Sequence, residues 1–532
     1  MGLGFNKPAD APGKAWPAIL IGLFVAFGGV LYGYDTGTIS GILANDYWVN
    51  LFKTKGNDGI TAGQDSLIVS ILSVGTFFGA LSAAPVADTL GRRWGLLLSS
   101  LIVFNVGVIL QSAATAQPLF IAGRFFAGLG VGLISAMIPL YQSETAPKWI
   151  RGAVVGAYQW AITIGLLLAS IVNYTVRNRQ DTGSYRIPVA VQFVWSLILV
   201  IGLIFLPETP RFLIKQDKHD QAVKSLAKIR RLPPDHSAIV EEIAEIQANH
   251  DYEMSLDKAT YLDILKGTVG QRLLTGCLLQ GLQQLTGVNF IFYYGTQYFE
   301  NAGFSNPFII SVITNGVNVL STVPGLYLVE KMGRRNLLLM GAVGMAICQY
   351  IVAITGTVTD TDNISAQKAA IAFVCIYLFF FASSWGPVAW VVTGEMFPLK
   401  VRAKCLSITT ATNWLLNWAI AYATPYMVNK EYANLGSKVF FIWGSFCWVC
   451  IVFVWFMIYE TKGLTLEEVD ELFGVCRKAW ESHKFRPQVS FMDVNDMNAG
   501  GGRKMSLTEI TEAAQRKKGV THLEVTAEKQ SE

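Results

Sequence analysis

Long apolar segments are the feature that most restricts the fold of this sequence. Windows of about 20 apolar residues predict membrane-spanning helices. They lie near residues 17–40, 66–88, 95–115, 118–140, 153–175, 188–206, 270–298, 307–330, 337–356, 367–394, 405–428 and 438–459. The composition agrees, since only 15% of the residues are charged, against about 25% in soluble domains. We therefore predict an all-α membrane protein with twelve transmembrane helices.

Short motifs in the first six spans are repeated in the last six. "DTLGRRW" corresponds to "EKMGRRN", "ETAPKWIRG" to "EMFPLKVRA" and "PETPR" to "YETKG", in the same order. A duplicated six-helix unit is typical of the major facilitator fold, which has two six-helix halves. The predicted parts are an N-terminus at 1–15, a six-helix bundle at 16–206, a linker with short helices at 207–268, a second bundle at 269–460 and a tail at 461–532.

Lysine and arginine accumulate in the loops that follow the even-numbered spans. By the positive-inside rule, these loops and both termini face the cytoplasm. We expect a multi-pass protein of the plasma membrane. Two N-x-S/T sequons, at Asn173 and Asn363, then fall on the outer side.

Other classes of protein find little support in the sequence. The net charge of +4 is small and predicts no nucleic-acid partner. The seven cysteines do not form two CxxC motifs, and most lie within apolar runs, so we expect free thiols and no metal site. Because no nucleophile with a base and no phosphate-binding loop is present, we expect neither an enzyme nor a cofactor.

Six motifs resemble those of the sugar porter family of the major facilitator superfamily, over roughly residues 15–475. They are "GRR" in both halves, "GRFFAGLGVG" (123–132), "PETPR" (207–211), "QQLTGVNFIFYY" (283–294), "WGPVAWVVTGEMFP" (385–398) and "ETKGLTLEEV" (460–469). With "YDTGTISG" and "SSWGPVAW", the chain is most similar to fungal hexose transporters. This resemblance implies alternating-access transport of monosaccharides such as glucose, with xylose as another candidate substrate.

Neutral amides and aromatic rings inside the spans suit a sugar, because buried charges would cost too much desolvation. The candidate ligands are Gln159, Gln283, Gln284, Asn289, Asn318, Trp390 and Asn417, with Tyr32 as a candidate ring contact. The alternative is that the amides only bond one helix to another. The resemblance implies a break in the seventh span, for which Gly287 is the candidate, and an outer gate formed by Tyr293 and Tyr294. A second break is expected at "GP", residues 386–387.

Charged residues at the cytoplasmic helix ends form a second candidate set. They are Asp88, Arg92, Glu144, Arg151, Glu208, Arg211, Glu330, Arg334, Glu395, Arg402 and Glu460. Carboxylates and guanidiniums can pair bidentately across neighbouring helices. The resemblance implies a cytoplasmic latch that is closed in the outward-facing state. The alternative is charge that only anchors loops.

Asp35 lies in the outer third of the first span, where an isolated carboxylate costs about 2.5 to 3.5 kcal/mol. Arg124 of the fourth span lies at the same predicted depth, so we expect the two to pair. The pair is either a permanent fastener or a proton switch. We favour proton symport over facilitated diffusion, and both over a transporter-like glucose sensor.

The expected partners are thus a monosaccharide, a proton and the lipid bilayer. The C-terminal tail reads as disordered from residue 490 and carries Ser506 after basic residues, as well as several lysines. A kinase or a ubiquitin ligase is a further candidate partner there.

Overall fold

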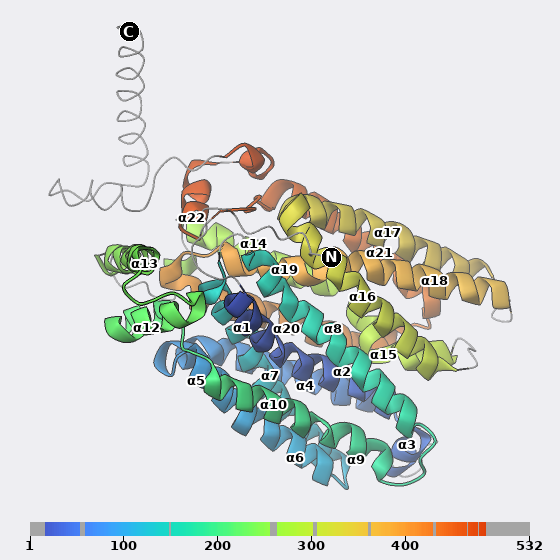
Figure 1. Cartoon of the computed structure of the whole chain (residues 1–532). Coiled ribbons are helices and arrows are strands. Elements are labelled where there is room, and N and C mark those ends of the chain that lie inside the picture. Colours follow the sequence, from blue (N-terminus) through green and yellow to red (C-terminus); the bar gives the residue numbers. More distant parts are fainter. Residues whose placement is uncertain are drawn as a thin grey trace, which may run out of the picture.

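The computed structural model describes residues 16–53, 59–147, 150–255, 263–265, 267–301, 306–359, 363–428, 432–464, 466–476 and 478–485. Helices are the only regular elements within these ranges (Figure 1). Ten helical segments are long and apolar enough to cross a membrane. The tail from residue 486, including Ser506, lies outside the described residues.

The first half of the chain contributes six spans. Their bounds are α1 (Trp16–Ala26) with α2 (Gly28–Leu43), α4 (Ala62–Thr89), α5 (Arg92–Leu98) with η1 (Ser99–Phe104) and α6 (Asn105–Ala113), α7 (Gln117–Thr145), α8 (Arg151–Val176), and α9 (Gly183–Ala190) with α10 (Gln192–Phe205). A short helix, α3 (Asp46–Phe52), follows α2. The π-helical turn η1 keeps the third span continuous.

The second half contributes six more. Their bounds are α14 (Gly267–Leu285) with α15 (Val288–Asn301), α16 (Pro307–Met332), α17 (Arg334–Val358), α18 (Ile364–Phe380) with η3 (Phe381–Trp385) and α19 (Gly386–Glu395), α20 (Leu399–Val428), and η4 (Gly436–Lys438) with α21 (Val439–Met457). The described residues therefore form the twelve predicted membrane spans, several of which consist of two or three consecutive helices. The seventh and eleventh spans are not among the ten apolar segments, because the seventh is broken into two helices and the eleventh carries polar residues.

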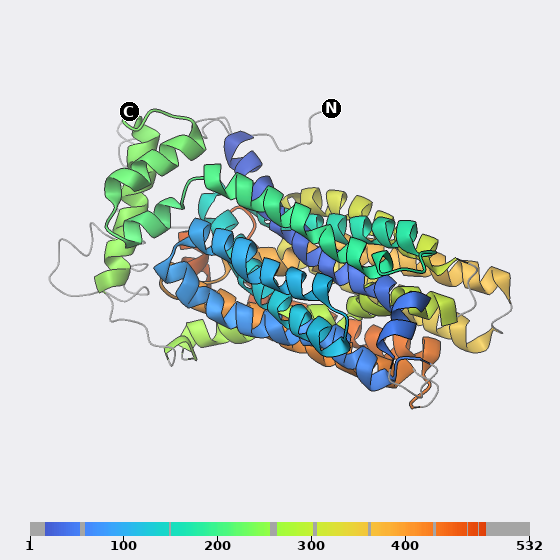
Figure 2. The same ribbon diagram turned by 90° about the horizontal axis from the view of Figure 1, so that it is seen from below.

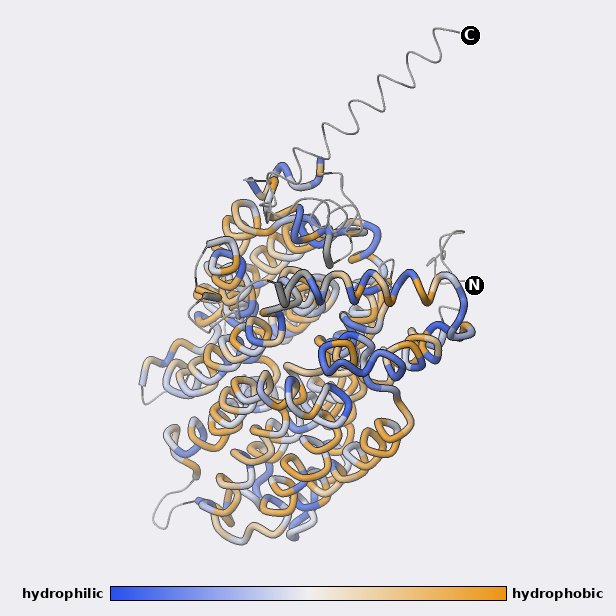
Figure 3. Tube along the Cα trace, turned by 90° about the vertical axis from the view of Figure 1, so that its left-hand side faces the viewer, coloured by the Kyte–Doolittle hydropathy of each residue, from blue (hydrophilic) through white to orange (hydrophobic). Residues whose placement is uncertain are grey.

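Small helices gather at one end of the bundle (Figures 1 and 2). They are α11 (Pro210–Lys215), α12 (His219–Arg230), α13 (Ser237–Ser255), η2 (Asp263–Leu265), α22 (Leu466–Val475) and η5 (Ala479–Lys484). Figure 3 looks onto this end and shows hydrophilic residues there, in front of largely hydrophobic helices. This is the end that the sequence predicts to be cytoplasmic.

The two halves meet along a few helix pairs. In particular, α4 packs on α20, α8 packs on α16 and α19, and α2 packs on α15. Within the first half, glycines allow helices to approach closely: a methyl group on Gly128 would lie 2.2 Å from the backbone oxygen of Leu72. Such contacts are a common way of packing helices in a membrane.

Two sequence expectations need refinement. The expected break at residues 386–387 is a π-helical turn, Phe381–Trp385, inside an otherwise continuous tenth span. Of the two sequons, Asn173 is buried in α8 and donates to the backbone oxygen of Gly37 at 3.0 Å, so a glycan has no access to its amide. Asn363 is exposed and caps the N-terminus of α18.

Candidate functional site

The break in the seventh span lies in the middle of the bundle, at Gly287. Its φ of +84° belongs to the left-handed region, which glycine adopts without strain. Leu285 ends α14 and Val288 begins α15, so the predicted break is confirmed. The interruption lets side chains from both helices reach the same space between the halves.

The amides around this break form one connected network. Gln283 donates to the backbone oxygens of Trp385 at 2.9 Å and Gly386 at 3.1 Å. Gln284 donates to Gln283 at 3.3 Å, and the Oε1 of Gln284 accepts from Asn289. The network joins α14, α15 and the tenth span in a buried position.

Asn417 on α20 extends the network to the first half. Its amide nitrogen donates to Gln284 at 3.2 Å, and its oxygen accepts from the hydroxyls of Ser73 at 2.6 Å and Tyr293 at 3.0 Å. Ser73 belongs to α4 and Tyr293 to α15. One carboxamide therefore links both halves to the predicted outer gate.

Asn318 on α16 is different. Its side chain is fully buried, yet neither its amide nitrogen nor its amide oxygen has a hydrogen-bond partner among the described residues. An unpaired buried amide costs about 1 to 3 kcal/mol. A polar ligand with hydroxyl groups would satisfy both atoms.

Aromatic rings surround the amides. The ring of Trp390 meets that of Tyr158 edge to face, with centroids 5.4 Å apart. Tyr32 packs in the same way on Trp414 at 4.9 Å, and so joins α2 to α20. Gln159 lies next to Gly386, where an added methyl group would be 3.2 Å from its Cγ. The structure thus places Tyr32, Gln159 and Trp390 at contacts between the two halves.

Both tyrosines of the predicted outer gate are buried and hydrogen-bonded. Tyr294 donates to the backbone oxygen of Ala421 at 2.8 Å, next to the bond between Tyr293 and Asn417. Beyond it, Ser40 and Thr296 share a hydrogen bond of 3.1 Å across the halves. Asn315 donates to Ser170 at 2.8 Å.

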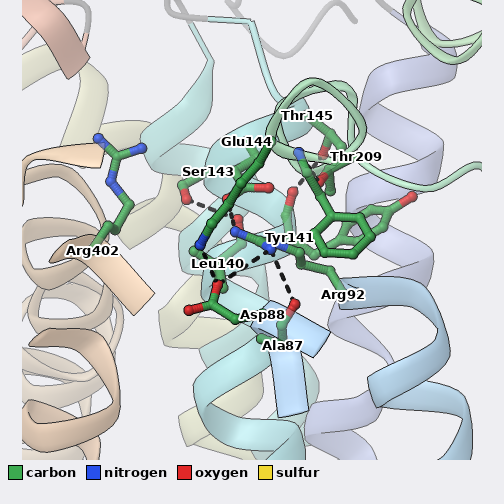
Figure 4. A network of polar contacts seen from close by, with 12 residues as sticks. Ala87, Asp88, Arg92, Leu140, Tyr141, Ser143, Glu144, Thr145, Thr209 and Arg402 are labelled. Carbon is green, nitrogen blue, oxygen red and sulfur yellow. Dashed lines mark hydrogen bonds and ion pairs between the residues drawn. The ribbon is translucent and has the colours of Figure 1, made fainter. Parts of the chain in front are cut away.

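At the opposite end, Arg92 is the centre of the charged residues that are predicted to form a latch in the first half (Figure 4). Its guanidinium lies 2.9 Å from Glu144 and 3.9 Å from Asp88. The carboxylate of Glu208 is held by the backbone: it accepts from the N–H of Arg92 at 3.1 Å and so caps the N-terminus of α5. Burial raises the pKa of the Glu208 carboxyl, although its N–H donors and Arg92 oppose this. Arg211 lies nearby in the first turn of α11.

The second half repeats this arrangement. Arg334 pairs with Glu330 at 3.0 Å and with Glu395 at 2.8 Å, and Glu460 accepts from its backbone N–H at 2.9 Å. Glu330 also accepts from the backbone N–H of Ala153 at 3.2 Å, which joins the two halves. The remaining predicted members, Arg151 and Arg402, are buried, and Arg402 donates to the backbone oxygen of Phe397 at 3.0 Å.

Asp35 and Arg124 form the expected ion pair, with Oδ2 and Nη1 3.1 Å apart. Both side chains are buried in the first half. Gln192, at the start of α10, donates to the other carboxylate oxygen at 3.1 Å. This third member was not predicted, because Gln192 is only one polar residue at the start of an apolar run.

Two further residues were missed. Asn413 donates to Gln280 at 2.7 Å and to Gln283 at 2.9 Å, and Trp414 supplies the ring behind Tyr32. A signal was present: Asn413 and Asn417 are four residues apart, so both lie on one face of α20.

Comparisons with known proteins agree with this arrangement. The model of the sugar (and other) transporter family matches residues 21–473. The chain belongs to this family. It is therefore a multi-pass membrane transporter with the major facilitator fold, and not an enzyme.

Individual relatives have transporter and sensor names. The chain is 62% identical to the major facilitator-type transporter ecdD of Aspergillus rugulosus, over 92% of this chain and 93% of ecdD. It is 52% identical to the probable glucose transporter rco-3 of Neurospora crassa, over 94% and 86%. It is 44% identical to the high glucose sensor RGT2 of Saccharomyces cerevisiae, over 89% of this chain and only 62% of RGT2.

Solved structures of the proton:xylose symporter XylE share the fold. The form bound to 6-bromo-6-deoxy-D-glucose matches with a TM-score of 0.77 at 28% identity, covering 86% of this chain and 100% of XylE. The inward-open form matches with a TM-score of 0.66. The contact between Glu330 and the N–H of Ala153, which joins the halves at the end with the small helices, is in keeping with the lower similarity to an inward-open form.

Proposed function

We propose that the chain carries monosaccharides, hexoses such as glucose first among them, across the plasma membrane by alternating access. The observation that carries this proposal is the set of neutral amides between the halves, with Asn318 buried and lacking a protein partner among the described residues. Neutral donors and acceptors beside aromatic rings suit a sugar, which offers hydroxyls and an apolar ring face. Xylose has the same chemistry and remains a candidate.

Each end of the bundle would open in turn. On the outer side, opening requires α15 to release the bond from Tyr293 to Asn417 and the bond from Tyr294 to Ala421. On the inner side, it requires Glu330 to leave the N–H of Ala153. Since the sugar ligands come from both halves, a bound sugar would lower the cost of bringing them together.

We further propose that transport is coupled to protons through Asp35. Protonation removes the charge that holds Arg124, and the first half can then rearrange around the sugar. The name of XylE, a proton:xylose symporter, supports this choice. Facilitated diffusion, with Asp35 as a permanent fastener, is the alternative.

The membrane orientation and the division of the chain are part of the proposal. Both termini would face the cytoplasm, as would the linker at 207–268 and the tail at 461–532, with the bundles at 16–206 and 269–460 and an N-terminus at 1–15. The basic loops and the end at which the small helices gather support it. The tail would be the place for a kinase or a ubiquitin ligase to act.

A glucose sensor of transporter fold is the second candidate, because RGT2 is a relative. The alignment covers 62% of the length of RGT2. The relatives ecdD and rco-3, at 62% and 52% identity, have transporter names, and this supports transport as the first candidate.

One experiment separates these functions. Uptake of labelled glucose is measured in a yeast strain without its own hexose transporters, with and without a proton uncoupler, and with xylose, galactose and fructose as competitors. We expect saturable uptake that the uncoupler reduces. A rate of uptake that the uncoupler does not change would indicate facilitated diffusion. A delivered protein without any uptake would contradict transport.

A further inference from the structure

The break in the seventh span leaves one backbone carbonyl without its usual partner. In a continuous helix, the oxygen of Thr286 would accept from the N–H of Phe290. Here the N–H of Phe290 donates instead to the oxygen of Gly287 at 3.1 Å. A buried carbonyl left unpaired in a membrane would be strongly unfavourable.

Two side chains from other helices donate to this carbonyl. The amide nitrogen of Gln349 on α17 lies 2.7 Å from the oxygen of Thr286, and the hydroxyl of Tyr377 on α18 lies 3.0 Å from it. Both side chains are about 1% exposed. They come from α17 and α18, which supply none of the predicted sugar ligands or gate residues.

A third helix, α21, also packs against the break. A methyl group on Gly287 would lie 2.4 Å from the ring of Trp443 on α21. The thiol of Cys447, one turn further along α21, contacts the amide oxygen of Gln349 at 3.6 Å. The break is therefore held from three sides by α17, α18 and α21.

The break separates two groups of predicted sugar ligands and gate residues along the seventh span. Gln283 and Gln284 precede the break on α14, whereas Asn289 and Tyr293 follow it on α15. The angle between the two helices decides whether these amides face the same sugar. A displacement of about 1 Å is enough to weaken a hydrogen bond severely.

We propose that Gln349 and Tyr377 are positioning residues that fix the hinge between α14 and α15 by sharing the carbonyl of Thr286. The hinge keeps the amides of the two helices aligned while α15 opens and closes. The effect on sugar binding rests on the proposed function, whereas the hinge itself does not.

The test compares Tyr377→Phe, Gln349→Leu and the double variant. Tyr350→Phe is the matched control, because Tyr350 follows Gln349 on α17 but bonds to Ser445 at an exposed site. Each single variant leaves the carbonyl one donor, so we expect the KM of glucose uptake to rise roughly threefold, with kcat little changed. The double variant should raise KM by more than the product of the two single effects. The control should match the wild type.

A second measurement does not depend on sugar. Hydrogen exchange of the purified protein is followed by mass spectrometry in peptides from α14 and α15. We expect the double variant to exchange at least fivefold faster in α15, with α14 unchanged, and the control to match the wild type. Unchanged exchange in α15 would overturn the proposal, as would faster exchange throughout the bundle. If the wild type carries no sugar but α15 responds as expected, the proposed function fails and the hinge survives.

Discussion

The guanidinium of Arg124 lies 3.1 Å from one carboxylate oxygen of Asp35, and both side chains are about 1% exposed. Gln192 donates to the other carboxylate oxygen. Both oxygens of Asp35 are therefore hydrogen-bonded, and a change in its charge alters the balance of a buried network. Desolvation of the two charges is expensive, so the pair exists either for function or as a firm link between helices.

Asp35→Asn distinguishes these roles. If Asp35 is a proton switch, the variant mimics the protonated state, so uphill accumulation of labelled glucose should vanish while sugar binding and exchange survive. If Asp35 is only a fastener, Arg124 loses its counter-charge, which should cost about 3 to 5 kcal/mol and reduce folding and surface delivery. Accumulation, exchange and surface amount are measured together.

The matched control is Asp181→Asn. Asp181 pairs with Arg179 at 2.8 Å, but both side chains are about half exposed. We expect wild-type accumulation and delivery from this variant. Proton coupling through Asp35 would be excluded if the Asp35→Asn protein reaches the membrane, takes up glucose like the wild type, and neither protein responds to the uncoupler.

Asn318→Leu tests the sugar site. Leucine removes an amide that has no partner among the described residues, so thermal stability should be unchanged or higher. Loss of hydrogen bonds to sugar hydroxyls, at about 1 to 3 kcal/mol, should raise the KM of uptake about tenfold or more. Unfolding temperature and uptake kinetics are measured on the same preparation.

Asn417→Leu is the contrasting variant. Asn417 bonds to Ser73, Tyr293 and Gln284, so its loss should lower both stability and uptake. If Asn318→Leu lowers the unfolding temperature, as Asn417→Leu should, and leaves KM unchanged, Asn318 is a structural residue.

The sequence predicted the fold and the central pair for simple physical reasons. Hydropathy reports each span directly, and the depths of Asp35 and Arg124 follow from counting residues along two helices. The break at Gly287 followed from the family resemblance, since glycines inside other spans leave the helix continuous. The spans and the ion pair depend on local sequence or on one pair of helices.

The donors that complete each network could not be predicted in this way. Gln192, Asn413 and Gln349 act on atoms 63 to 157 residues away in the chain, and some of their partners are backbone carbonyls. A sequence does not state which carbonyl a break will leave free. In the latch, Glu208 bonds to backbone N–H groups at the start of α5, which the charge pattern alone does not indicate.

Glu330→Ala tests the latch. The variant removes the acceptor for the N–H of Ala153 across the halves and one partner of Arg334. A weaker latch favours the state open at this end, so the apparent affinity for external sugar should fall and that for internal sugar should rise. A shift of about 1 kcal/mol in the equilibrium between the two states would change the apparent affinity roughly fivefold. Binding is measured in right-side-out and inside-out vesicles.

Lys215→Ala serves as the control for the latch, because Lys215 of the linker bonds to Asp88 without joining the two halves and is about half exposed. Its affinities should match those of the wild type on both sides. A parallel loss of affinity on both sides in Glu330→Ala would instead place Glu330 in the sugar site.

Glu208→Gln tests the buried carboxyl that caps α5. Burial raises the pKa of Glu208 above its ordinary value. A carboxyl with a raised pKa in the folded state stabilises the fold fully below its unfolded pKa of about 4.3 and loses this contribution as the pH rises through the folded pKa. The variant keeps an acceptor for the N–H groups and buries no charge. We therefore expect its unfolding temperature to exceed that of the wild type near neutral pH, with the difference shrinking as the pH falls.

Glu481→Gln is the control for Glu208→Gln. Glu481 forms a half-exposed pair with Lys478, so this variant should show no such trend with pH. A Glu208→Gln variant that is less stable near neutral pH would mean that the N–H donors and Arg92 outweigh burial.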